Sequence, residues 1–320
     1  MKLFDCLITP IITYASVIWG PLNAKNLNHE NLYEVCNNSP IEKLNLKLCK
    51  FLLGVHGKST NVAVRGELGR YPLLINVLNL ASRYHKRIEL LDSTTLVKNS
   101  CSDYFIQNYE TSWPTIMAKI LNQFSTADIL KNEMENQYRD KWSLHIQSCR
   151  TKGKLTLYAQ IKKCFTLENY VLQFPPYLRR NFTKLRISAH NLAIETGRYS
   201  KPIETPIDKR VCFHCKEVEN EFHFMLTCSL YDAERKCLYN DLSKMLSVPI
   251  NPCEESFILI MSGLNGDIEV SKVICEFLNK CFKIRSENLS YKIETDILQR
   301  IKPSQTRLGR ISKRPTILDL

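Results

Sequence analysis

Apolar residues recur along most of the chain with the 3.6-residue period of an amphipathic helix. This period predicts helices at about 40–53, 72–91, 114–124, 126–149, 229–247 and 254–284. Alternating apolar and polar positions, which would indicate strands, do not form a comparable series. We therefore expect a mainly α-helical fold with little sheet. The polar, weakly patterned segment 92–111 is expected to be a loop-rich boundary.

The helix predicted from residue 40 has the clearest boundary signals. Ser39 is a suitable N-cap, Pro40 suits the first helical position, and Glu42 would complete a capping box. Gly54 stands where a glycine commonly ends a helix. The core face of this helix is expected to contain Ile41, Leu44, Leu48, Phe51 and Leu52.

The first twenty residues contain an apolar run that superficially resembles a signal peptide. Asp5 and Pro10 interrupt this run, and no small-residue cleavage site follows it. The run is also too short and too broken to span a bilayer, and no other apolar run approaches that length. We expect a buried helix or helix pair here, and no membrane partner.

The charge balance changes the picture. Lys and Arg number 44 against 32 Asp and Glu, which gives a formal net charge of +12. Such an excess is typical of proteins that bind a polyanion, although it can also serve solubility alone. The 13 scattered cysteines fit a reducing compartment better than a disulfide framework. We therefore expect an intracellular protein, nuclear or cytoplasmic.

One cluster of residues predicts a metal site. Cys212, Cys215, His223 and Cys228 form the pattern C-x2-C-x7-H-x4-C, which supplies a full tetrahedral ligand set for zinc. Four protein ligands leave no position for a reactive water, so the pattern favours a structural zinc. His214 could replace one ligand. The alternative is that four unrelated residues fall into this pattern by chance, because the chain has 13 Cys and 7 His.

A basic stretch precedes this motif. Nine basic residues lie between 150 and 186, where only Glu168 opposes them: Arg150, Lys152, Lys154, Lys162, Lys163, Arg179, Arg180, Lys184 and Arg186. Six aromatic residues are interleaved with them: Tyr158, Phe165, Tyr170, Phe174, Tyr177 and Phe182. Basic groups contact phosphates and rings stack on bases, so the stretch predicts a nucleic-acid surface. Alternatively, most rings face the core and the lysines are merely solvated.

The segment between these two features carries a family resemblance. Residues 185–198 contain the run L-R-x-S-x-H-x-L-x-I-E-T-G-R, and the Cys/His motif follows it. Together they resemble the C-terminal region of non-LTR (LINE-type) retrotransposon reverse transcriptases. The runs ITPIITYASVIWG at 8–20, IEKLNLKLCKFLLGV and GELGRYPL resemble the thumb that follows the polymerase palm. The resemblance covers roughly residues 3–245.

The resemblance implies an organisation and a partner. The chain would comprise a thumb-like helical region at 1–92, a helical connection at 93–176, a zinc-binding region at 177–247, C-terminal helices at 248–301 and a basic tail at 302–320. Its partners would be RNA or DNA and the remaining parts of a retroelement polyprotein, with no small-molecule substrate. The Cys/His motif would hold zinc. The expected nucleic-acid contacts are Arg179, Arg180, Lys184, Arg186, His190 and Arg198.

The Cys/His motif itself is expected to act as a scaffold. It contains Glu217, Glu219 and Glu221, which would repel phosphates. Its expected role is to fix the direction in which the segment 177–210 leaves the helical body. The tail contains Lys302, Arg307, Arg310, Lys313 and Arg314 against Asp319; it could bind nucleic acid, act as a localisation signal or simply be solvated.

Catalytic groups of the related enzymes are missing from the sequence. No Asp-Asp pair occurs anywhere, although a two-metal polymerase needs clustered carboxylates. No endonuclease carboxylate and histidine set is recognisable either. We therefore expect a fragment or truncated copy without catalysis of its own. The alternative is a protein-interaction module or a decayed fragment with no selected activity.

Overall fold

The computed structural model describes residues 3–106, 110–124, 129–151, 153–246 and 251–301. Its helices are η1 (Phe4–Ile8), α1 (Thr9–Ile12), α2 (Ser16–Leu22), α3 (Leu32–Asn38), α4 (Pro40–Leu53), α5 (Asn61–Leu68), α6 (Leu73–Glu89), α7 (Leu96–Ile106), α8 (Trp113–Phe124), α9 (Leu130–Ser148), α10 (Thr156–Ile161), α11 (Asn169–Gln173), α12 (Pro176–Arg186), α13 (Ala193–Thr196), η2 (Gly197–Tyr199), η3 (Ile207–Lys209), η4 (His223–Thr227), η5 (Ser229–Tyr231), α14 (Asp232–Leu246), α15 (Glu254–Met261), α16 (Gly263–Gly266) and α17 (Ile268–Ile301).

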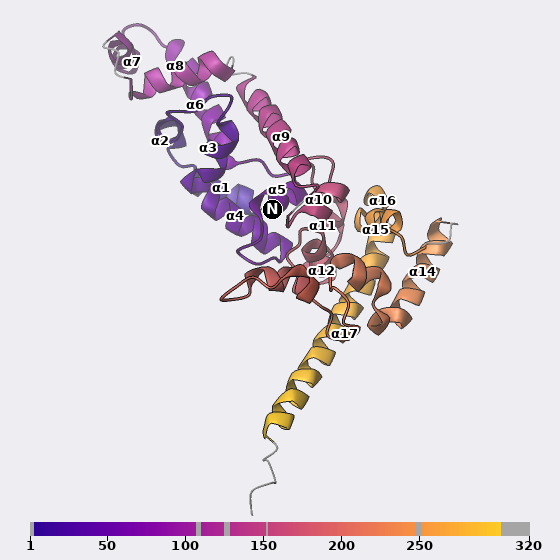
Figure 1. Cartoon of the computed structure of the whole chain (residues 1–320). Coiled ribbons are helices and arrows are strands. Elements are labelled where there is room, and N and C mark those ends of the chain that lie inside the picture. The colour runs from indigo at the N-terminus through magenta and orange to yellow at the C-terminus, as the bar shows by residue number, and fades with distance from the viewer. Residues whose placement is uncertain (1–2, 107–109, 125–128, 152, 247–250, 302–320) are drawn as a thin grey trace, which may run out of the picture.

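The predicted fold class is confirmed. Of the residues that the structure describes, 71% are helical, and this part of the chain has two isolated β-bridges but no strand. The molecule is elongated, with α7 and α8 at one end and the long helix α17 projecting from the other (Figure 1). Each of the six predicted helices has a counterpart; the last corresponds to α15, α16 and α17 together. The expected loop at 92–111 contains helix α7, which the polar sequence concealed.

A first hydrophobic core lies among helices α2 to α10, and we call this part of the protein the first lobe. Long helix α6 crosses it and buries Leu74 completely. Helix α9 contributes one stripe with a four-residue spacing: Met134, Tyr138, Trp142 and Ile146. A Cβ at Gly66 would lie 2.5 Å from the Trp142 ring and from the Tyr158 hydroxyl, so the packing requires glycine there.

A second hydrophobic core joins α12, α14, α15 and α17 to residues 212–231, and we call this part the second lobe. Cys212 and Cys228 both belong to it. The predicted metal-binding segment is therefore built into a larger lobe and is not a free-standing subdomain. The first core also crosses the boundary expected near residue 92, because Ile116 and Trp142 pack in the same core as Leu74.

A buried ion pair joins the two lobes. Arg186, at the end of α12, is 1% exposed, and its Nη2 lies 3.0 Å from Glu67 Oε1 of α5. Its Nη1 donates to the Met261 carbonyl at the end of α15, at 2.6 Å. The Tyr170 hydroxyl donates to the other carboxylate oxygen of Glu67. Because these buried polar groups satisfy one another, the contact fixes α12 between the lobes.

The boundaries predicted for the helix from residue 40 are confirmed, but its predicted core face is wrong. Gly54 ends α4 with φ of 66°, as a glycine at this position should. Glu42 is not part of a capping box; it is buried, with Oε2 2.5 Å from Arg65 Nη2. Because this ion pair turns Glu42 inward, Leu44 and Phe51 lie on the solvent side, 43% and 80% exposed.

The N-terminal segment is helical as predicted, but its apolar side chains are not buried. Five of them are more than half exposed: Leu3, Leu7, Ile11, Tyr14 and Ile18. Among the described residues, no single helix is long and apolar enough to cross a bilayer. The bent pair Phe4–Ile12 and Ser16–Leu22 passes that test of length and composition when its two halves are taken together.

Two predictions fall on residues outside the described ranges. These residues are Lys152 of the basic stretch and the basic tail 302–320.

Candidate metal centre

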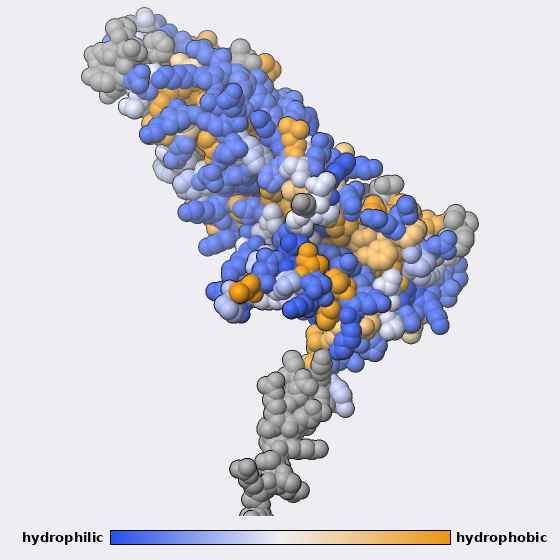
Figure 2. Space-filling view, viewed as in Figure 1, coloured by the Kyte–Doolittle hydropathy of each residue, from blue (hydrophilic) through white to orange (hydrophobic). Residues whose placement is uncertain are grey.

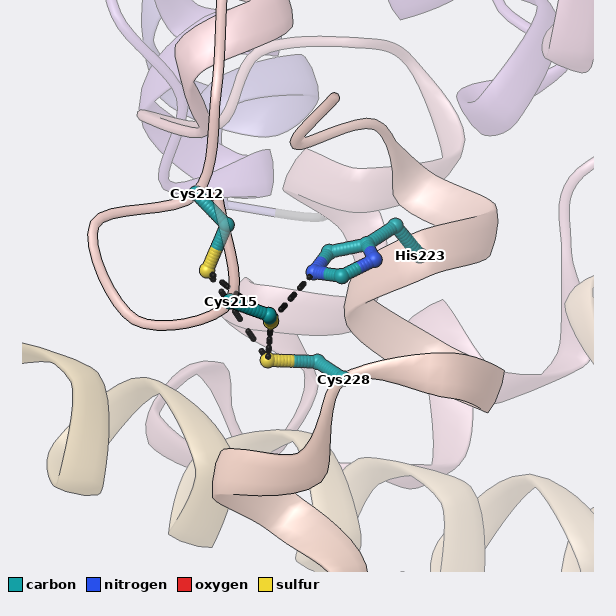
Figure 3. Close-up of side chains that lie close together, drawn as sticks. All are labelled: Cys212, Cys215, His223 and Cys228. Atoms are coloured by element: carbon teal, nitrogen blue, oxygen red, sulfur yellow. Dashed lines mark hydrogen bonds between the residues drawn. The ribbon is translucent and has the colours of Figure 1, made fainter. Parts of the chain in front are cut away.

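The structure brings the four predicted metal ligands together (Figure 3). Their ligand atoms all lie within 4.8 Å of one another. The Cys215 sulfur is 3.4 Å from the Cys228 sulfur, 3.7 Å from the Cys212 sulfur and 3.2 Å from His223 Nε2. An ideal tetrahedral zinc with bonds of about 2.3 Å to sulfur and about 2.0 Å to nitrogen would separate such atoms by about 3.5–3.8 Å. The residues therefore fit a tetrahedral ion.

A short hairpin presents the first two ligands. Val211 and Val218 form an antiparallel bridge, and the Cys212 amide donates to the Glu217 carbonyl at 2.7 Å. Lys216, directly after Cys215, closes the turn with φ of 67°. A non-glycine residue rarely adopts this conformation, so the turn is held by its surroundings. His214 is exposed and is not in the four-residue cluster, so it takes no ligand position.

A single helical turn presents the other two ligands. His223 begins η4, and Cys228 follows its last residue. The Asn220 side chain accepts a hydrogen bond from the His223 amide at 2.7 Å, and this satisfies a backbone N–H at the start of the turn. Arg235 of α14 donates to the Met225 and Cys228 carbonyls at 3.0 and 2.6 Å. Both ends of the turn are therefore held by hydrogen bonds from residues outside the ligand set.

Hydrogen bonds among the ligands set their protonation. The Cys228 thiol stabilises the Cys212 thiolate, and this lowers the pKa of Cys212 to about 3. The same interaction raises the pKa of Cys228, since it gives the shared proton to that residue. Hydrogen bonding to Cys212 also raises the pKa of His223. A metal that binds here must displace the protons on the other ligands.

Groups outside the cluster orient His223. Its Nδ1 lies 3.1 Å from Glu217 Oε2 and 3.1 Å from Thr227 Oγ1, while Nε2 faces the sulfurs. A proton on Nδ1 leaves Nε2 free as the ligand atom. Carboxylates in this position commonly fix the tautomer of a metal-binding histidine.

Glu217→Gln is therefore expected to weaken metal affinity by about tenfold or more. The change keeps an oxygen near Nδ1 but removes the charge that stabilises its proton. Competition with a chromophoric chelator would measure the affinity. Asp208→Asn, which neutralises an exposed carboxylate outside the cluster, is the matched control. Equal affinities for the two variants would contradict this role of Glu217.

The other two glutamates of the motif hold it to the protein. Glu219 is 2% exposed; it pairs with Arg285 of α17 through two contacts of 2.9 and 2.8 Å. Glu221 accepts from His190 Nε2 at 2.9 Å and from the Ser188 hydroxyl at 3.3 Å. Part of the segment 186–198 therefore supports the metal-binding residues, through His190 and Ser188.

Three of the six predicted nucleic-acid contacts are buried, which corrects that expectation. Arg179 is 6% exposed and donates to the Leu52 carbonyl at the end of α4, at 2.7 Å. Arg186 is enclosed between the lobes, and His190 is bound to Glu221. A cation that is buried inside the protein is not placed to meet a phosphate. Arg198 is half-buried and pairs with Glu195 at 2.8 Å.

Arg180 and Lys184 remain at the surface of α12. Arg180 is exposed and Lys184 is half-buried. Burial and the neighbouring Arg180 hold the pKa of Lys184 below its usual value. Of the interleaved aromatic residues, Tyr177 alone is exposed, at 79%, so the alternative that most rings face the core is correct.

Sequence reasoning missed the cations of α4. Lys43 and Lys47 are exposed one turn apart on this helix, and Lys58 is exposed in the loop that follows it. The signal was present, because no Asp or Glu occurs between residues 43 and 66. The sequence does not show that these cations lie beside those of α12, because the two helices are more than a hundred residues apart. In the structure, Arg179 holds α12 against the end of α4.

Comparison with known proteins provides no relative. No protein-family model, no curated protein and no solved structure matches the chain. The family resemblance therefore rests on the sequence motifs alone.

Proposed function

We propose that the chain is a zinc-stabilised, nucleic-acid-binding C-terminal region of a LINE-type reverse transcriptase, without catalysis of its own. The geometry of the four ligand atoms carries the metal part of this proposal. Three thiolates and one imidazole at tetrahedral separations favour zinc over the hard cations, which prefer oxygen ligands. A closed ligand set suits a structural ion. The absence of any Asp-Asp pair from the sequence supports the lack of polymerase chemistry.

The nucleic-acid part of the proposal is supported by the surface where α4 meets α12. Lys43, Lys47, Arg180 and Lys184 lie on these helices, and among the described residues none of them takes part in an ion pair. The segments 43–66 and 169–194 contain no acid. Hydrophilic residues cover most of the visible face of the first lobe (Figure 2). Cations that have no ion-pair partner are suited to phosphate contacts.

The double variant Arg180→Ala/Lys184→Ala is expected to reduce the slope of log affinity against log salt by about 1.4–1.8 units. Each lost phosphate contact no longer releases its counterion. Fluorescence anisotropy with a labelled oligonucleotide at several salt concentrations would measure the slope. Lys236→Ala/Lys244→Ala removes the same charge from exposed positions of α14 and is the control. Identical slopes for the two double variants would remove this surface from the proposal.

A protein-interaction module is the second candidate, and the N-terminal helices favour it. Leu7, Ile11 and Tyr14 are 61%, 69% and 82% exposed on neighbouring turns, which is a large apolar face for a protein in water. Binding through this face would depend weakly on salt because it needs no phosphate contact. A salt-insensitive interaction that Ile11→Ser abolishes would favour this function over nucleic-acid binding.

A further inference from the structure

Helix α4 displays a stripe of cations that ends in an aromatic ring. Lys43, Lys47 and Phe51 are spaced four residues apart, so they share one face of the helix. Both lysines are exposed, and the Phe51 ring is 80% exposed. The Phe51 ring at the end of this stripe offers an apolar surface that a ligand could cover. The burial of Glu42 and Asn45 on the opposite side of the helix fixes this orientation.

Helix α12 continues the stripe. Tyr177, Arg180 and Lys184 follow one another at helical spacing, and the Tyr177 ring is 79% exposed. A Cβ on Gly54 would lie 2.8 Å from Arg180 Nε, so Arg180 lies directly over the end of α4. The two stripes therefore meet at Gly54. We call the six residues Lys43, Lys47, Phe51, Tyr177, Arg180 and Lys184 the α4–α12 ribbon.

The scaffold under the ribbon is rigidly held. Arg179 donates to the Leu52 carbonyl, which ties α12 to the end of α4. On the other side, the Asn279 side chain of α17 donates to the Leu178 carbonyl at 2.9 Å and bonds Asn181 at 2.7 Å. Exposed side chains on fixed helices keep their spacing when a ligand binds, and this reduces the ordering cost of binding.

The positive charge of the ribbon comes from the two segments that carry it. No acid occurs in the two segments that carry it, 43–66 and 169–194. Among the described side chains, helix α17, which packs on α12, adds no net exposed charge: its exposed Lys272, Lys280 and Lys283 are balanced by its exposed Glu269, Glu276 and Glu287. By contrast, the apolar N-terminal face is without a cation between residues 3 and 24. Arg70, the cation over the Phe4 ring of this other face, is paired with Asp5, whereas no cation of the ribbon takes part in an ion pair among the described residues.

We propose that the α4–α12 ribbon binds single-stranded nucleic acid, with Phe51 and Tyr177 as stacking platforms for bases. This rests on the proposed function and adds the form of its ligand. Phosphate contacts need only the cations of the ribbon, and a duplex offers phosphates as well as a single strand does. Exposed rings gain contact only from unpaired bases, whose faces a duplex keeps stacked inside. Among the described residues, neither ring takes part in a ring contact, and the rings are 80% and 79% exposed, so each has surface on which a base can stack.

The test compares single strands with a duplex on the full chain. Labelled oligo(dT) and oligo(U) of equal length and a duplex of that length would be titrated with the wild type, Phe51→Leu and Tyr177→Ala. Each substitution is expected to weaken binding of oligo(dT), oligo(U) or both by about fivefold or more, because base–ring stacking is lost. Affinity for the duplex is expected to change less than twofold. Phe51→Leu keeps an apolar side chain at an exposed position, so it preserves the fold.

The control is Tyr291→Ala, which removes a ring that is 70% exposed on α17, outside the ribbon. It should leave all three affinities unchanged. Equal losses for single strands and duplex, or no loss in either ribbon variant, would overturn the proposal. The Arg180→Ala/Lys184→Ala variant separates this failure from a failure of the proposed function. If that variant reduces the salt slope while Phe51→Leu and Tyr177→Ala leave the affinities unchanged, nucleic-acid binding stands and only the stacking proposal fails. If the chain binds no strand at all, both the proposed function and the stacking proposal are overturned.

Discussion

Cys215→Ser is expected to lower the free energy of unfolding of the second lobe by about 4 kcal/mol or more. When the free concentration of the ion is roughly 1,000 times its Kd, binding stabilises the folded state by about that amount. Cys212 and Cys228 belong to the second core, and Glu219 ties the metal-binding residues to α17. Loss of the ion should therefore destabilise the whole second lobe, whose core includes Leu185 of α12.

Hydrogen exchange resolved along the chain would measure this effect. The variant should lose protection in 176–246 and 254–285, while α6 and α9 of the first lobe keep theirs. Cys237→Ser, which changes an exposed cysteine of α14 outside the cluster, is the control and should exchange like the wild type. Unchanged protection in Cys215→Ser would mean that the cluster does not stabilise the lobe.

Arg186→Ala is expected to destabilise the protein by about 3–5 kcal/mol, because it leaves Glu67 charged and unpaired in the interior. Arg186 also contacts Glu168 Oε2 at 3.2 Å and the Met261 carbonyl, so the change affects both lobes. Burial opposes the charge of Arg186, yet Glu67, Tyr170 and Glu168 together keep its pKa above the usual value. The guanidinium therefore stays charged and has no neutral form to adopt.

Urea unfolding followed by circular dichroism would measure the loss. Arg180→Ala removes an exposed arginine from the same helix and should change stability by no more than about 0.5 kcal/mol. The double variant Glu67→Gln/Arg186→Met leaves no unpaired charge, so its loss should be smaller than the sum of the two single losses. An Arg186→Ala variant as stable as Arg180→Ala would show that the ion pair does not hold the lobes together.

The sequence predicts the helices well because their signals are local. The period of apolar residues identifies α6, α8, α9 and α14, and Gly54 marks the end of α4 correctly. The core face of α4 was mispredicted because Glu42 was assigned to a local capping box. Its actual partner, Arg65, is 23 residues away, and no periodicity in the sequence reveals such a pair.

The candidate metal site was predictable for the same reason. Its ligands lie within seventeen residues, and the spacing of thiols and imidazole carries the chemistry. The nucleic-acid contacts were not predictable residue by residue. Arg179, Arg180, Lys184 and Arg186 look alike in sequence, but the partners that distinguish them come from α4, α5 and α15. A count of charges cannot separate a buried, paired arginine from an exposed one.

The central claim is that Cys212, Cys215, His223 and Cys228 share one zinc ion. Native mass spectrometry of the chain, purified under reducing conditions with zinc supplied, tests it most directly. The account predicts one zinc for each folded chain and none in Cys215→Ser. A folded wild-type chain without zinc, or one zinc retained in the variant, would contradict it.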